Sequence, residues 1–284
     1  MTQIAFIGAG AIAERHIDAI RRTGVGDVAV VASRSPDRAR ALAEKKAIRR
    51  HTADVDDAIH DPDVDTVVVA YPTFLHASLA LEALRAGKHV VVEKPFAEST
   101  DDARIVADTA VTSGRSLLVC QVRRFWPCYT AVRQAIAAGT LGPVTRASID
   151  FQASWNWRDR GWRVERPGGY FLDMHVHEID LLCWWAGTAP LSVVAVGENA
   201  AEREGVVALR FPRALGVLEF SGRVPGKPYP AESTTFAQVT GERGVAEVQL
   251  VGGTSVVTLS ADGQKERFER TIADENRLGW DRMW

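Results

Sequence analysis

Cysteine, net charge and long apolar runs are all scarce in this chain of 284 residues. Its three cysteines, Cys120, Cys128 and Cys183, share no C-x-x-C spacing, which argues against a disulfide framework and a cysteine zinc site. The formal net charge is only −2, and pairs such as Arg21-Arg22 are too short to track phosphates, so we expect no nucleic-acid partner. No apolar run reaches the length of a membrane span and no leader precedes the first strand, so we expect no membrane contact and a cytoplasmic protein.

The pattern of apolar runs predicts an α/β protein of two domains, which suits the length of the chain. Up to residue 121, apolar strands alternate with helices, as in a parallel doubly wound sheet. From Val144 onward, short runs of period-two character predict a mostly antiparallel, open-faced sheet that a helix over 170–185 interrupts. We expect a Rossmann domain over 1–121 and an α+β domain for substrate binding and oligomerisation over 122–284.

A glycine turn follows the first predicted strand. After Ile4–Ile7, the segment GAGAIA from Gly8 to Ala13 fits G-x-G-x-x-G/A, with Ala13 at the third small position. Gly8 allows the tight turn, and Gly10 lets a pyrophosphate approach the N–H groups that open the next helix. The alternative is a glycine turn that binds no ligand.

The end of the second predicted strand, 28–32, lacks the acidic residue that would hold a ribose 2′-hydroxyl. Ser33 offers a hydroxyl there, Arg34 a bidentate phosphate donor, and Arg38 lies one helical turn later. This set favours the 2′-phosphate of NADP, with NAD as the second possibility. In the alternative interpretation, both arginines are solvated residues of the helix over 37–46.

Acid-base residues occur in two places. Lys94 follows the apolar strand 89–92, where open α/β sheets bind ligands. If a helix begins near Tyr170, then Asp173, His177 and Asp180 share one face. The alternative is that the aspartates cap or solubilise the helix and that His177 is a satisfied interior histidine.

These motifs resemble the Gfo/Idh/MocA oxidoreductases. The likeness rests on GAGAIAERH from Gly8, AYPTFLH from Ala70, AGKHVVVEKP from Ala86, RRF from Arg123 and GGYFLDMHVHEID from Gly168. It covers most of the chain, and the last two motifs look most like the inositol dehydrogenase branch. The resemblance implies hydride transfer between a nicotinamide cofactor and a secondary alcohol or ketone of a cyclitol or sugar.

The resemblance also implies site residues. Lys94, Asp173 and His177 would be the catalytic set. The cofactor would contact Gly8, Gly10, Ala11, Ile12, Ser33, Arg34, Arg38, Tyr71, Pro72, His76, Glu93, Lys94 and Gln121. The substrate would contact Lys94, Arg123, Arg124, Trp155, Asn156, Trp162, Asp173 and His177.

The chemistry of alcohol oxidation supports the same catalytic roles. A base must take the hydroxyl proton while hydride leaves, and a neutral imidazole at His177 has a suitable intrinsic pKa. Asp173, one helical turn earlier, could fix its tautomer, and Lys94 could stabilise the alkoxide. The tryptophans Trp155 and Trp162 could stack on polyol C–H groups or, equally, pack a sheet edge or subunit interface.

Some residues depart from the family pattern. His175 replaces a small residue, and we expect it to pack or to make a surface hydrogen bond. Because His175 and His177 lie two residues apart on a helix, they cannot converge on one ion, and we predict no metal. Family members usually continue past the last strands with a further helix that packs back on the cofactor domain, and we expect this chain, which stops at Trp284, to be C-terminally short of that helix. The aromatic ending Trp280–Trp284 is expected to be buried by a partner or by the protein itself.

Two functions of different class therefore remain. The first is an active dehydrogenase or reductase, and the second is a noncatalytic dinucleotide-binding sensor or assembly protein. Retention of Lys94, Asp173 and His177 favours the enzyme. A homodimer or homotetramer is expected from the family and from the open sheet face.

Overall fold

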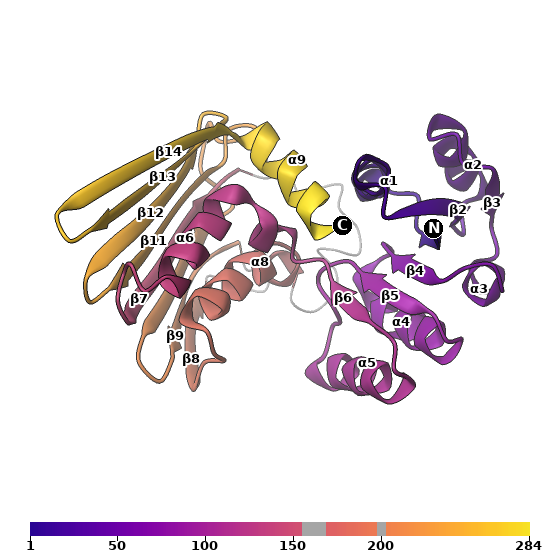
Figure 1. Ribbon diagram of the computed structural model, residues 1–284, viewed down its shortest axis with the longest axis horizontal. Helices are drawn as coiled ribbons and strands as arrows, with labels where there is room; N and C mark the ends of the chain where they lie inside the picture. Colours follow the sequence, from indigo (N-terminus) through magenta and orange to yellow (C-terminus); the bar gives the residue numbers. More distant parts are fainter. Residues whose placement is uncertain (155–168, 198–202) are drawn as a thin grey trace. The chain divides into compact units, whose positions relative to one another are not determined.

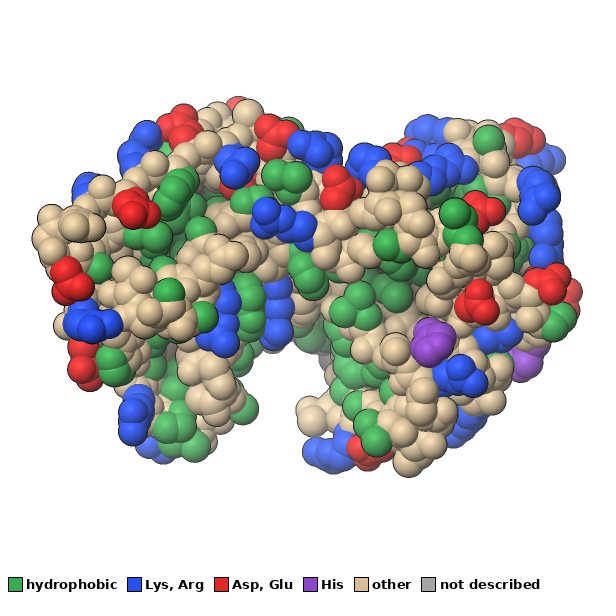
Figure 2. Space-filling view, viewed as in Figure 1, with side chains coloured by type: hydrophobic (Ala, Val, Ile, Leu, Met, Phe, Trp, Pro, Cys, Tyr) green, Lys and Arg blue, Asp and Glu red, His purple; other side chains and the backbone are tan. Residues whose placement is uncertain are grey.

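The computed structural model describes residues 1–154, 169–197 and 203–284 (Figure 1). The chain divides into two compact units. The first contains Met1–Gln121 together with Trp280–Trp284, and the second contains Val122–Gly279. Within the described ranges, no helix is long and apolar enough to cross a membrane. On the face drawn in Figure 2, basic and acidic side chains are interspersed.

The first unit is built on a six-stranded parallel sheet with the order β3-β2-β1-β4-β5-β6. Its central strands are apolar and buried on both faces, because helices cover both sides of such a sheet. The predicted Rossmann architecture is confirmed, with one edge strand more than expected. The strands are β1 (Thr2–Ile7), β2 (Gly26–Ala32), β3 (Arg50–Thr52), β4 (Thr66–Val69), β5 (His89–Val92) and β6 (Leu117–Val119). The helices are α1 (Ala11–Thr23), α2 (Pro36–Lys45), α3 (Val55–His60), η1 (Thr73–Leu75), α4 (His76–Arg85) and α5 (Thr100–Ser113).

The second unit contains an eight-stranded sheet with the order β14-β13-β12-β11-β7-β10-β9-β8. Neighbouring strands are antiparallel except for β7 and β10, which run parallel. The strands are β7 (Val144–Gln152), β8 (Ser192–Gly197), β9 (Glu204–Arg210), β10 (Leu215–Ser221), β11 (Thr234–Gly241), β12 (Gly244–Val251), β13 (Thr254–Ala261) and β14 (Gln264–Thr271). Helical segments are η2 (Val122–Phe125), α6 (Pro127–Ala137) and α8 (Gly169–Ala186).

Among the described residues, helices α6 and α8 cover one face of this second sheet, and no helix covers the other (Figure 1). The strand register aligns buried residues in rows, because side chains alternate between the two faces of a sheet. Neighbours on the opposite face, such as Val206 and Phe236, are exposed. The open-faced sheet expected from the sequence is therefore present. One buried row contains Val207, Leu218, Ile149, Ala237, Val248 and Val257.

A last helix, α9 (Ile272–Met283), corrects the expectation that the chain lacks one. Thr271 caps its first turn, since the hydroxyl accepts the Asp274 N–H at 3.0 Å. The buried carboxylate of Glu275 accepts hydrogen bonds from the Cys128 amide and the Ser255 hydroxyl. Trp280 is buried, as the aromatic ending led us to expect, and the residues from Trp280 onward belong to the first unit.

Candidate active site

The glycine turn after β1 uses its two glycines differently. Gly8 has φ +125°, its N–H donates to the Ala32 carbonyl at 2.8 Å, and a Cβ there would lie 2.2 Å from the Ala70 carbonyl oxygen. Gly10 caps α1 in an extended conformation, and a Cβ there would meet nothing within 4 Å. The fold therefore requires Gly8, whereas Gly10 leaves open space beside the free N–H groups of the helix start.

The loops after β2 and β4 are joined by a hydrogen bond. The Tyr71 hydroxyl accepts the backbone N–H of Arg34 at 2.9 Å, and the Arg34 guanidinium lies 5.6 Å from the centre of the Tyr71 ring. Ser33 is buried and its hydroxyl accepts the Ser35 N–H. Arg34 and Arg38 are exposed, and neither forms an ion pair with a carboxylate among the described residues. The two guanidinium groups can therefore meet an anion.

Glu93 and Lys94 directly follow β5. The buried Glu93 side chain accepts the Lys94 backbone N–H through Oε2 at 3.0 Å, while its Oε1 lies 2.9 Å from Nε2 of His16. Lys94 is half-buried and precedes Pro95 through a cis peptide bond. Two polar contacts thus offset the cost of burying this carboxyl group.

His76 lies beneath the same loops and is only 1% exposed. Its ring nitrogens lie 2.7 Å from the Pro95 carbonyl and 2.6 Å from the Tyr71 carbonyl. Burial lowers the pKa of His76, and it outweighs these two carbonyl oxygens, which act in the opposite direction. A neutral ring donates to one carbonyl at a time, so His76 supports the loops that carry Tyr71 and Lys94.

In the second unit, α8 carries the predicted acid-base residues. Asp173 is half-buried and His177, one helical turn later, is 9% exposed. The helix begins at Gly169, close to the predicted start, so these two residues share a face as expected. His175 is fully buried, with its ring 4.2 Å from that of Phe220, so it packs in the interior.

Arg123 and Arg124, predicted to contact substrate, are both paired with carboxylates of α8. Arg123 bonds the buried Glu178, whose other oxygen lies 3.2 Å from Nδ1 of His175. Arg124 donates two hydrogen bonds to Asp180, at 2.7 and 2.6 Å, and this bidentate contact raises the pKa of the arginine. These pairs hold η2 against α8, and Asp180, predicted to share a face with Asp173 and His177, forms an ion pair with Arg124.

Both units match models of known protein domains. The model of an oxidoreductase family with an NAD-binding Rossmann fold matches residues 2–121. The model of the GFO/IDH/MocA C-terminal domain matches residues 129–247. The chain is also 35% identical to 1,5-anhydro-D-fructose reductase of Ensifer adhaerens over 257 residues, covering 89% of this chain and 76% of the relative. This chain belongs to the Gfo/Idh/MocA oxidoreductase family.

Other relatives extend over nearly the whole chain. Inositol 2-dehydrogenase of Rubrobacter xylanophilus is 30% identical over 300 residues, covering 98% of this chain and 81% of the relative. A crystal structure of a probable dehydrogenase from Thermotoga maritima is 25% identical with a TM-score of 0.81, covering 98% of this chain and 85% of that one. The predicted family membership is therefore confirmed.

The first unit of this Gfo/Idh/MocA protein fits a nicotinamide dinucleotide. Gly10 leaves open space, with nothing within 4 Å of the place where a Cβ would lie, beside the N–H groups that open α1 and can hold a pyrophosphate. The exposed guanidinium groups of Arg34 and Arg38 follow β2, where the adenosine ribose binds in Rossmann folds. Of the other predicted cofactor residues, Ala11 is exposed and Ile12, Pro72 and Gln121 are half-buried.

Three predicted substrate residues, Trp155, Asn156 and Trp162, lie outside the described residues.

Within the described part, one group could hold a metal ion: ligand atoms of His16, Glu93 and Cys120 lie within 4.8 Å of one another. Burial raises the pKa of the Cys120 thiol well above its ordinary value, which disfavours the thiolate that a metal needs. A hydrogen-bonded pair of His16 and Glu93 accounts for these contacts.

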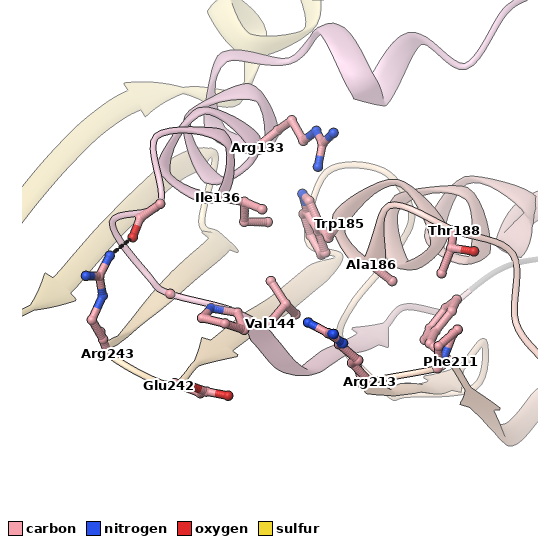
Figure 3. Close-up of a pocket in the computed structure, with 15 residues that line it drawn as sticks. Arg133, Ile136, Val144, Trp185, Ala186, Thr188, Phe211, Arg213, Glu242 and Arg243 are labelled. Atoms are coloured by element: carbon pink, nitrogen blue, oxygen red, sulfur yellow. Dashed lines mark hydrogen bonds between the residues drawn. The ribbon is translucent and has the colours of Figure 1, made fainter.

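The second unit also has a cavity of about 740 Å³, and none of the predicted site residues that the structure describes lines it (Figure 3). Its wall includes the buried Trp185, the half-buried Arg133 and the exposed Arg213 and Arg243. Arg243 donates a hydrogen bond to the Gly139 carbonyl. Its described lining contains arginines but no histidine or lysine, so it does not match the predicted alcohol-oxidation chemistry.

Proposed function

We propose that this protein is an NAD(P)-dependent oxidoreductase that transfers hydride between a nicotinamide cofactor and a secondary alcohol or ketone of a sugar or cyclitol. One observation carries the proposal. This chain, a member of the family with an intact dinucleotide turn, has Lys94 soon after β5, and it has Asp173 and His177 one helical turn apart on α8. Relatives named as an anhydrofructose reductase and an inositol dehydrogenase support this substrate class.

The roles of the three residues follow from their chemistry. When bound, the nicotinamide accepts or supplies the hydride. His177 takes the hydroxyl proton in oxidation and returns it in reduction, and Asp173 orients the imidazole or binds a neighbouring hydroxyl. Lys94 stabilises the negative charge that develops on the alcohol oxygen. Lys94 belongs to the first unit, and Asp173 and His177 belong to the second.

We further propose that NADP is preferred over NAD. Ser33, Arg34 and Arg38 support this preference, because the strand before them ends without an acid and the two guanidinium groups have no carboxylate partner among the described residues. The test compares Arg34→Ala with Arg40→Ala, whose native arginine is exposed but paired with Asp37 at 2.9 Å.

In this test NADPH binding should weaken by about tenfold or more in Arg34→Ala, while NADH binding stays within about twofold. Arg40→Ala should bind both cofactors like the native protein. If Arg34→Ala weakens the binding of NADPH and of NADH equally, the proposal that Arg34 binds the 2′-phosphate is contradicted.

We propose that the second unit also mediates self-association into a homodimer or homotetramer. The sheet face that no described helix covers exposes apolar residues such as Val206 and Phe236, and this exposure supports the role. Light scattering across a concentration series tests it. A Phe236→Asp variant should lower the molecular mass, and a native protein that is monomeric throughout would contradict it.

The proposed activity is tested by a screen of cofactor absorbance with 1,5-anhydro-D-fructose, inositols and common sugars, in both directions. Turnover with any of these compounds supports the enzyme. Tight cofactor binding without turnover across the panel would instead favour the noncatalytic sensor that the same fold allows.

A further inference from the structure

The first unit encloses a histidine that the proposed mechanism does not use. His16, on the inner face of α1, is 0% exposed and is surrounded by three aromatic rings. The rings of Phe6, Trp280 and Trp284 have centroids 5.5, 4.5 and 5.7 Å from that of His16, all in edge-to-face geometry. The two tryptophans come from the end of α9 and from the residue after it, so distant parts of the chain meet at this imidazole.

Both ring nitrogens of His16 have a polar partner. The Trp284 indole N–H donates to Nδ1 at 3.1 Å, and Nε2 lies 2.9 Å from Oε1 of Glu93. Because an indole nitrogen can only donate, Nδ1 must carry the lone pair. In the neutral ring the proton is then on Nε2, which donates it to the Glu93 carboxylate. The opposite tautomer would place a lone pair of Nε2 against a carboxylate oxygen and an N–H of Nδ1 against the indole N–H.

The same carboxylate continues the chain of contacts to the proposed catalytic lysine. Oε2 of Glu93 accepts the backbone N–H of Lys94 at 3.0 Å. We propose that Trp284 is a positioning residue that fixes the Nε2-protonated tautomer of His16, and through it the orientation of Glu93 and of the backbone at Lys94. The tautomer rests on geometry alone, whereas its effect on turnover rests on the proposed function.

Trp280 offers a matched control for Trp284. Both indoles pack edge-to-face on His16, but the Trp280 Nε1 is buried and has no hydrogen-bond partner within the described residues. Replacement by phenylalanine therefore removes an N–H that donates to the histidine in one variant and an N–H without an acceptor in the other. Both variants keep an aromatic ring at the site, so the difference between them reports on the hydrogen bond.

The first measurement is the imidazole ¹⁵N spectrum of His16, which distinguishes the tautomers without any cofactor or substrate. The native protein and Trp280→Phe should both show the Nε2-protonated form. Trp284→Phe should show a shifted Nδ1 resonance, because this nitrogen no longer accepts a hydrogen bond. A native spectrum of the Nδ1-protonated form, or an unchanged spectrum in Trp284→Phe, would overturn the proposal. The native spectrum alone decides the tautomer if a variant fails to fold.

The second measurement is steady-state kinetics. Trp284→Phe should lower kcat/KM by roughly 3- to 30-fold, while Trp280→Phe stays within about twofold of the native value. Equal losses in the two variants would indicate ring packing rather than positioning by the hydrogen bond. Absence of turnover in the native protein would count against the proposed function only, because the spectrum decides the tautomer independently.

Discussion

The two units place their proposed functional residues by different physical means. In the first, these residues lie in loops that follow buried parallel strands, and hydrogen bonds to the backbone fix the loops. The Glu93 carboxylate accepts the Lys94 N–H, and the His76 ring contacts two backbone carbonyl oxygens. In the second, they lie on a helix that ion pairs hold to η2, as with Arg124 and Asp180. Substitutions in the first unit should therefore alter the conformation of these loops. Substitutions in the second unit should alter how firmly α8 is held to η2.

The largest expected effect removes one catalytic residue from each unit. Lys94→Met and His177→Ala should each lower kcat by roughly 10² to 10⁴, because each deletes a group that stabilises charge or moves a proton. Cofactor binding, measured by fluorescence titration, should persist in both variants. Turnover near the native rate in either one would remove the role assigned to that residue.

Breaking the buried ion pair tests how α8 is held. Glu178 is 1% exposed, so Glu178→Gln leaves the Arg123 charge without its carboxylate and should cost about 3–5 kcal/mol of unfolding free energy. Asp180→Asn is the control. Its arginine is 39% exposed, and this pair should contribute only about 1 kcal/mol. Urea unfolding measures the unfolding free energy that each variant loses. Equal losses in the two variants would contradict the expectation that the buried pair contributes more than the exposed one.

The two glycines after β1 separate folding from binding. Gly8→Ala should lower the thermal midpoint, because its Cβ would lie 2.2 Å from the Ala70 carbonyl oxygen and its φ is +125°. Gly10→Ala should leave the midpoint unchanged and weaken cofactor binding by at least about tenfold, since the new methyl group would lie in the space where the pyrophosphate is expected to approach the helix. A stable Gly10→Ala variant with native affinity would show that the cofactor does not approach this residue.

The smallest expected effect is a pH dependence from the loops of the first unit. Burial lowers the pKa of His76 from its ordinary value of 6.5, so the unfolded chain takes up a proton that the folded one resists. Stability should therefore be fully present above about pH 6.5 and fall as the pH decreases below it. His76→Gln should flatten this slope, whereas the exposed His51→Gln should not. Thermal midpoints between about pH 5 and 8 measure the difference.

Local patterns in the sequence predict most of the fold. Apolar runs such as Ile4–Ile7 identify the strands of the first sheet, and period-two runs identify the second. The strand β3 escapes prediction because it is three polar residues at a sheet edge. The helix α9 escapes because Gly279 interrupts it, and this glycine is needed where a Cβ would lie 2.4 Å from Trp126.

Long-range pairing is what the sequence does not show. Arg123 and Glu178 are 55 residues apart, and His16 and Glu93 are 77 apart, so neither contact has a local signal. No local pattern therefore indicates that Arg123 and Arg124, which are predicted to contact substrate, are also paired with carboxylates. His16 has one indirect signal, because it falls on the same helical face as the buried Ala13, Ile17 and Ile20.

Transfer of hydride between cofactor and substrate is the central claim, and isotope transfer tests it most directly. NADPH with deuterium at C4 of the nicotinamide is mixed with the protein and whichever ketone of the panel supports turnover, or each ketone in turn if none does. Mass spectrometry of the product alcohol should find the deuterium on carbon, with transfer greatly slowed in His177→Ala. A product without deuterium, or cofactor that stays bound and unreacted with every ketone, would contradict the account.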